Sequence, residues 1–317
     1  MGEFELIERF FKRPARRSPL GVGDDCALLA PAPGMALAVS SDMLVEGRHF
    51  LPGTDPRSLG HKCLAVNLSD LAACGARPLA FTLALALPDA DARWLELFSQ
   101  GLLALADAHN CELVGGDTTR GPLTICITVF GEVPAGQALL RSGAHAGDDV
   151  YVSGSLGNAR LALEVLRGDQ SVTAPVLAAA RARLERPAPR VALGMALRGL
   201  ATAAIDVSDG LLGDLGHVLR QSGVGVTVDV DAVSHLMGAG QAVGADLRRM
   251  FTLAGGDDYE LAFTAPAAAR DAVQAAPALA GTRITRIGHI EALPGLRLVD
   301  AQGQPVSGQF GAFDHFG

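Results

Sequence analysis

Apolar and polar positions in the first part of the chain follow two kinds of pattern. Short apolar, β-rich runs predict strands, and these runs are Met35–Ser40, Leu79–Leu87 and Leu123–Val133. A first helix is predicted to begin at Asp55-Pro56, an N-cap followed by proline, and to end near Gly75. A second helix is predicted from about Asp91 to Asn110, where leucines and a phenylalanine recur at helical spacing.

The second part of the chain mixes the same two patterns. Helices are expected at Asn158–Arg167, Pro175–Glu185, Arg190–Leu200 and Leu211–Ser222. Strands are expected at Asp149–Ser153, Ala203–Val207, Gly225–Val230, Tyr259–Thr264 and Arg283–Ile290. Because strands and helices do not alternate strictly, the pattern favours an α+β or mixed-sheet α/β class. We expect domains at 1–137 and 138–317, joined through the small-residue stretch 134–147.

Composition narrows the class of protein. A chain of 317 residues with 49% hydrophobic and 19% charged residues is expected to form about two globular domains. No apolar run approaches the roughly 18 residues of a membrane span, and the acidic start does not resemble a signal peptide, so we expect a cytoplasmic protein. The net charge of −8 disfavours a nucleic-acid partner.

The informative chemistry is a series of aspartates, each in a glycine or hydroxyl turn beside an apolar run. The motifs are G-V-G-D-D (21–25), S-S-D (40–42), N-L-S-D (67–70), G-G-D-T-T (115–119), D-V-S-D-G (206–210) and G-G-D-D-Y-E (255–260). Any one aspartate in such a turn can be a simple cap or turn former. The six motifs together contain more aspartates than helix capping and turn formation require.

Three of these motifs stand out. Asp70 lies inside a predicted helix whose other residues are nearly all apolar, where an uncompensated carboxylate is costly and a capping role is excluded. Ser40–Asp42 follows a predicted strand and is expected to present three oxygen ligands where that strand opens into a loop. Asp206 and Asp209 bracket Ser208 at a predicted helix start.

This excess of oxygen ligands indicates Mg²⁺ or Mn²⁺ rather than zinc, because no matching cysteine or histidine cluster exists. The chain has only two lysines, Lys12 and Lys62, and no Walker A motif, so a lysine phosphate clamp has almost no candidates. Backbone N–H groups of a Gly115-Gly116 loop, and of Ser208 and Gly210 at a helix start, are candidate phosphate binders. Together these features predict a metal-assisted phosphoryl-transfer site.

The motif string resembles the thiamine-monophosphate kinase family of the aminoimidazole ribonucleotide synthetase-like superfamily. The matching stretches run from residue 21 to 316 and include GVGDDCALL, SSDMLVEGRHF, AVNLSDLAACGARP, LVGGDTTRGPL, RSGAHAGDDVYVSG, AIDVSDGLLGDLGH, LAGGDDYELAFT and FDHF. The resemblance implies two α/β domains and a homodimer whose N-terminal sheets pair into a barrel. It also implies direct transfer of the γ-phosphoryl group of ATP to thiamine monophosphate with several Mg²⁺ ions.

Residue roles follow from the same resemblance. It implies metal ligands at Asp25, Ser40, Ser41, Asp42, Asp70, Asp117, Asp206 and Asp209. It implies ATP contacts at Gly116, Asp117, Arg141 and Ser208, and substrate contacts at His49, Asp257 and Phe313. The family usually has glutamate at the position of Asp257, and aspartate keeps the charge with a shorter reach.

Two alternatives stay open at this stage. A sister enzyme such as aminoimidazole ribonucleotide synthetase shares the metal motifs, although not the G-R-H-F histidine (His49) together with a terminal aromatic residue. A non-catalytic nucleotide- or metal-binding regulator is the alternative from another class, and the completeness of the acidic motifs argues against it.

Overall fold

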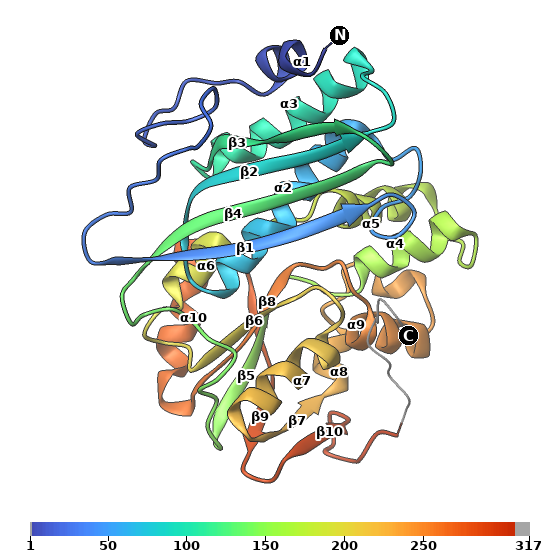
Figure 1. Cartoon of the computed structure of the whole chain (residues 1–317). Coiled ribbons are helices and arrows are strands. Elements are labelled where there is room, and N and C mark those ends of the chain that lie inside the picture. The colour runs from blue at the N-terminus through green and yellow to red at the C-terminus, as the bar shows by residue number, and fades with distance from the viewer. Residues whose placement is uncertain (1, 308–317) are drawn as a thin grey trace. The chain divides into compact units, whose positions relative to one another are not determined.

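The computed structural model describes residues 2–307, and the chain divides into two compact units. The first unit holds the residues up to Leu71 together with Ala76–Gly136, and the second holds Ala72–Gly75 and the chain from Gln137 onward. Both units combine helices with a β-sheet (Figure 1). The expected mixed α/β class is therefore confirmed.

The first unit is built on a four-stranded sheet in the order β1-β4-β2-β3. Its elements are α1 (Glu3–Phe10), β1 (Met35–Val45), α2 (Pro56–Ala73), β2 (Arg77–Leu87), α3 (Ala92–Ala108), β3 (Glu112–Arg120) and β4 (Thr124–Pro134). β2 and β3 are parallel, while β4 is antiparallel to both β1 and β2. The predicted cap of α2 is confirmed, since the Asp55 carboxylate accepts the N–H of Ser58 (2.9 Å).

The two faces of this sheet differ because side chains alternate along each strand. Figure 1 shows α2 and α3 together on one face of the sheet. Buried strand residues such as Phe81, Leu83 and Ile127 lie on that face. The other face carries exposed apolar residues of the edge strand β1, among them Val39 and Met43. The covered face therefore forms the core of this unit, and the open face leaves apolar surface in contact with water.

The second unit contains a six-stranded sheet in the order β10-β7-β9-β5-β8-β6. Its strands are β5 (Asp148–Ser153), β6 (Ala203–Val207), β7 (Gly225–Asp229), β8 (Glu260–Pro266), β9 (Ile284–Glu291) and β10 (Gly295–Val299). Its helices are α4 (Asn158–Arg167), α5 (Ala174–Glu185), α6 (Val191–Ala196), α7 (Leu211–Ser222), α8 (Val230–Ser234), α9 (Ala245–Ala254) and α10 (Arg270–Ala280), with short 3-10 turns at Gly240–Ala242 and Ala267–Ala269. One buried apolar cluster joins alternating strand residues to α7 and α8.

None of the helices in the described part of the chain combines the length and hydropathy that a membrane span requires.

A buried ion-pair group anchors β5 in this sheet. Asp149 is 1% exposed and accepts hydrogen bonds from Arg286 Nε (2.5 Å), from Arg270 Nη2 (2.9 Å) and from the Tyr151 hydroxyl (3.3 Å). The pKa of Asp149 is lowered to about 2, and the largest cause is its hydrogen bonding to Arg270. The hydrogen bond to Arg286 and the charges of the two arginines act in the same direction, whereas burial raises the pKa. The folded state therefore favours the ionised carboxylate.

This pKa gives a pH-dependent stability. A carboxylate with a depressed pKa stabilises the fold fully above its unfolded pKa near 4, and the contribution is lost as the pH falls toward 2. We expect Asp149→Asn to lower the free energy of unfolding by about 2 kcal/mol at pH 7, and the difference from wild type to shrink toward pH 2. Urea unfolding across pH 7 to 2, with the exposed Asp169→Asn as control, measures this. A difference independent of pH would contradict it.

Candidate functional site

A cavity of about 680 Å³ in the first unit brings together three of the residues expected at the site. Asp25 lies on its wall, and Gly116 and Asp117 of β3 lie on the wall as well. The cavity is lined further by residues of α1 and of the segment that follows it, including Phe11 and Lys12. The arrangement offers carboxylates and an accessible glycine backbone within one concave surface.

The expectation that Gly115 and Gly116 form a loop is wrong. They lie inside β3, which pairs in parallel with β2 through an irregular register between Phe81 and Thr82. Gly116 has φ +147°, and a Cβ atom there would lie 1.8 Å from the carbonyl oxygen of Leu83. The glycine is required because the neighbouring strand leaves no room for a side chain.

Lys12 is a residue of this cavity that the sequence interpretation set aside. Its ammonium group pairs with Glu8 one helical turn earlier (2.7 Å). The i, i+4 spacing of glutamate and lysine was the available signal, but it indicates only a helix surface. Glu8 and Lys12 line a cavity because β3 packs beside α1 in the folded chain.

A second group of oxygen ligands lies between β1 and α2. The Ser40 hydroxyl donates to Asp70 Oδ2 (2.5 Å), and the Asp42 N–H donates to Asn67 Oδ1 (3.1 Å). The expected loop at Ser40–Asp42 is wrong, because these residues lie within β1. Strand alternation places Ser40 and Asp42 on the α2 side.

Ser41 is consequently not brought together with its two neighbours. Its hydroxyl lies 3.0 Å from the Thr128 hydroxyl and donates to the Ile127 carbonyl (3.2 Å), both on the adjacent strand β4. Asn67, which sequence reasoning missed, instead reaches β1 from α2. Its signal was its position three residues before Asp70 on the same helix.

In the second unit, the turn between β6 and α7 holds Asp206, Ser208 and Asp209. Asp206 is buried at the end of β6, while Ser208 and Asp209 are half-buried. The N–H groups of Ser208, Asp209 and Gly210 all donate to Oδ2 of Asp214, at 3.1, 3.1 and 3.2 Å. These amides are therefore not available for the phosphate contact expected at a helix start, and the Ser208 hydroxyl is the group that remains.

Asp214 is a further residue that sequence reasoning missed. Burial, and then the nearby negative charge of Asp209, raises the pKa of Asp214 to about 7, although the three N–H donors act in the opposite direction. The side chain is 3% exposed. It fixes the turn that presents Asp209.

Arg141 lies in the same part of the second unit. The pKa of His217 on α7 is lowered by burial and by the charges of Arg220 and Arg141, whereas Asp209 raises it. Arg141 and Asp209 thus act on one side chain from the same neighbourhood. The exposed Arg141 guanidinium is available to a phosphate group there.

Two of the three expected substrate contacts, Asp257 and His49, lie in the described part of the chain, and each is held by a hydrogen bond. Asp257 has φ +67°, and its N–H donates to the Ser208 carbonyl (2.8 Å), so it is tied to the β6–α7 turn. His49 lies in the turn after β1, where its Nδ1 accepts the N–H of Val45 (3.0 Å), which places the proton of a neutral ring on Nε2. Phe313 lies outside the described residues.

The donor chemistry fits a magnesium ion that is shared with phosphates. Within residues 2–307, no three His, Cys, Asp or Glu side chains gather in a group able to hold a metal ion. Mg²⁺ usually takes one or two carboxylates and completes its octahedron with water and substrate phosphate oxygens. Carboxylate and hydroxyl donors such as Asp42, Asp70 and Ser40 meet that requirement.

Family models cover both units. A model described as AIR synthase related protein, N-terminal domain, matches residues 23–133, and the corresponding C-terminal domain model matches residues 145–301. The chain therefore belongs to the AIR synthase related protein family.

Curated relatives narrow this assignment. A thiamine-monophosphate kinase of Salmonella typhimurium is 47% identical over 99% of this chain and 98% of its own length. The solved structure of a thiamine-monophosphate kinase from Stenotrophomonas maltophilia K279a is 45% identical, covers 96% of each chain and has a TM-score of 0.85. Another solved structure, AaThiL complexed with AMPPCP and TMP, is 30% identical over 90% of this chain and 89% of its own, with a TM-score of 0.77. Within the superfamily, this chain is a member of the thiamine-monophosphate kinase family.

Proposed function

We propose that this chain transfers the γ-phosphoryl group of ATP directly to the phosphate of thiamine monophosphate, giving thiamine diphosphate and ADP. The observation that carries the proposal is the match over nearly the full chain to thiamine-monophosphate kinases, one relative being solved with AMPPCP and TMP. The acidic motifs and the cavity around Asp25, Gly116 and Asp117 supply the chemistry that such a reaction needs.

Several Mg²⁺ ions are part of the proposal. The residues that hold them are Asp25, Ser40, Ser41, Asp42, Asp70, Asp117, Asp206 and Asp209. Bound Mg²⁺ neutralises the charge of the two phosphorylated substrates, which otherwise repel each other. The side chains position the ions, and Ser41 joins this set on the strength of the resemblance alone.

ATP is held by Gly116, Asp117, Arg141 and Ser208. Gly116 and Asp117 line the same cavity as Asp25, where the exposed main chain of β3 can meet a phosphate. The Arg141 guanidinium donates to phosphate oxygens, and the Ser208 hydroxyl donates from a turn whose amides are already fixed by Asp214. Positioning and charge stabilisation are the main contributions of these residues.

Thiamine monophosphate is bound by His49, Asp257 and Phe313 in this proposal. The acceptor phosphate is already largely ionised at pH 7, so it attacks without a strong general base. The transfer is direct, and no side chain serves as a nucleophile. The Asp257 carboxylate offers a negative charge to the cationic thiamine ring system, with a shorter reach than the glutamate usual in the family.

We also propose that the protein acts as a homodimer in the cytoplasm. The open face of the first unit's sheet carries Leu37, Val39 and Met43 on its edge strand β1, with exposed fractions of 45%, 56% and 56%. Apolar side chains in such a row are typical of a surface that another subunit covers. Sedimentation equilibrium tests the dimer.

The test of function separates the alternatives. We expect ADP release by the purified chain to require both Mg²⁺ and thiamine monophosphate, and to stop when EDTA removes the metal. AMP and ribose 5-phosphate are the comparison acceptors in a coupled ADP assay. ADP release with another acceptor alone favours a sister enzyme, and nucleotide binding without ADP release favours a regulator.

A further inference from the structure

A segment that connects α1 to the first acidic motif is held firmly against α3 and β3. The Glu112 carboxylate of β3 accepts the main-chain N–H groups of Arg16 and Arg17 on Oε1 (3.0 and 2.9 Å) and that of Ser18 on Oε2 (3.1 Å). Although burial acts in the opposite direction, these donors keep the pKa of Glu112 below its ordinary value. The negative charge of Glu112 is thereby used to hold the backbone.

Two of the three arginines in this segment also form hydrogen bonds through their guanidinium groups. Arg13 donates through Nη1 to both carboxylate oxygens of Asp107 on α3, at 3.0 and 2.9 Å. Arg17 donates to the carbonyl oxygens of Asn110 and Leu79. The acidic groups near the segment are therefore satisfied by other donors.

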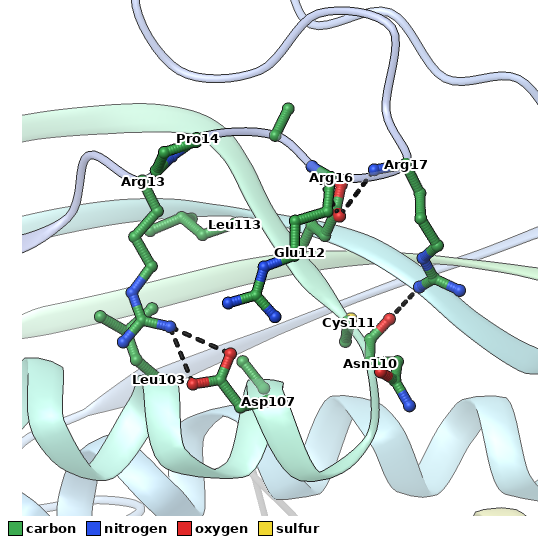
Figure 2. Close-up of a pocket in the computed structure, with 12 residues that line it drawn as sticks. Arg13, Pro14, Arg16, Arg17, Leu103, Asp107, Asn110, Cys111, Glu112 and Leu113 are labelled. Atoms are coloured by element: carbon green, nitrogen blue, oxygen red, sulfur yellow. Dashed lines mark hydrogen bonds and ion pairs between the residues drawn. The ribbon is translucent and has the colours of Figure 1, made fainter.

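Arg16 is the exception. Its side chain extends between those of Arg13 and Arg17, and no dashed line reaches its guanidinium group (Figure 2). Among the residues that the structure describes, this guanidinium has no hydrogen-bond or ion-pair partner, although the main chain of Arg16 is fixed by Glu112. An exposed cation without a hydrogen-bond or ion-pair partner in the described chain is thus left on a segment whose main chain is held by Glu112.

The guanidinium borders a cavity of about 340 Å³. The rest of the lining mixes apolar residues, Leu103 and Ala106 of α3 and Leu113 of β3, with the polar residues Asp107, Asn110 and Glu112. The charge of Asp107 is paired with Arg13, whereas Glu112 is bound by main-chain N–H groups and keeps its charge, so three arginines face two carboxylates in the lining and leave a net positive charge. The cavity is separate from the one that holds Asp25 and Asp117, and shares only Leu113 with it.

We propose that this cavity is a binding site for a phosphate group, with the Arg16 guanidinium as its principal ligand. A guanidinium presents paired N–H donors that match two phosphate oxygens. Arg13 and Arg17 add positive potential while they hold the segment in place. The site goes beyond the proposed kinase reaction and does not depend on it, because the binding requires neither Mg²⁺ nor ATP.

Inorganic phosphate is the probe for the test. Isothermal titration of the full chain, in EDTA and at constant ionic strength, is expected to show phosphate binding that Arg16→Gln weakens about tenfold, the scale of a lost hydrogen bond to a charged group. Arg16→Lys keeps the charge without the paired donors, so we expect it to retain part of the affinity. Thermal unfolding of each variant establishes that the fold is kept.

Two control variants locate the binding. Arg186→Gln removes an exposed arginine elsewhere in the chain and is expected to leave phosphate affinity unchanged. Arg141→Gln removes the arginine proposed to contact ATP. A loss of phosphate binding in Arg141→Gln but not in Arg16→Gln overturns the proposal, as does an equal loss in Arg16→Gln and Arg186→Gln.

Discussion

Replacing Asp209 with alanine is expected to lower kcat by roughly 10³-fold, the scale of losing one electrostatic contact to a transferring phosphoryl group. The side chain is half-buried in the turn between β6 and α7, where it is proposed to hold Mg²⁺. The substitution keeps the main-chain N–H that donates to Asp214. The turn should therefore survive while the charge is lost. A coupled ADP assay at saturating ATP and thiamine monophosphate measures kcat.

The control for Asp209→Ala is Asp169→Ala, which removes an exposed carboxylate beyond α4. It should leave kcat near the wild-type value, and both variants should unfold at nearly the wild-type temperature. Asp42→Ala tests the first unit in the same way, with the exposed Asp89→Ala as its control. Wild-type turnover in Asp209→Ala or Asp42→Ala would refute the metal-site assignment.

Local patterns in the sequence were sufficient to predict most of the helices and strands. The predicted helix at Asn158–Arg167 and the predicted strand at Ala203–Val207 have the bounds found in the structure. The helix carrying Asp70 was also expected, and the hydrogen bond from Ser40 helps to explain how a half-buried carboxylate is tolerated among the apolar residues of that helix. Periodicity and caps act over a few residues, so a sequence reports them directly.

The errors arise where neighbouring strands override local signals. Gly115 and Gly116 are typical of a loop, yet parallel pairing with β2 draws them into β3. Ser40–Asp42 has the composition of a turn, yet eleven consecutive pairs with β4 keep β1 extended from Met35 to Val45. A polar triplet at the end of an apolar run cannot reveal that the partner strand continues beside it.

The supporting residues Asp214 and Asn67 were not identified from the motifs. Asp214 accepts the three N–H groups of residues 208–210 from the first turn of α7, so its contact is local, yet the D-V-S-D-G motif ends before it. Asn67 reaches Asp42 only because α2 packs under β1. The role of Asn67 is therefore identified only by a tertiary contact, whereas that of Asp214 follows from its place at a helix start.

The most destabilising single substitution is expected at Glu260. This glutamate follows the strained Asp257–Tyr259 segment, is fully buried, and opens β8. Its carboxylate accepts hydrogen bonds at 2.6 Å from Arg183 Nη2, from Arg190 Nε and Nη2, and from the Ser153 hydroxyl. A Cβ atom at Gly154 would lie 2.0 Å from Glu260 Oε1, so the chain leaves room for this carboxylate and little else.

Glu260→Ala is expected to lower the free energy of unfolding by about 3–5 kcal/mol, because two largely buried guanidinium groups lose their counter-charge. Glu185→Ala is the matched control. It also removes a glutamate paired with an arginine, but Arg181 is 44% exposed, and such a surface pair contributes about 0–1 kcal/mol. Urea unfolding of both variants gives the comparison. Similar losses in the two variants would show that the Arg183–Glu260–Arg190 group contributes no more than an ordinary surface ion pair, and that burial of these charges costs as much as their pairing returns.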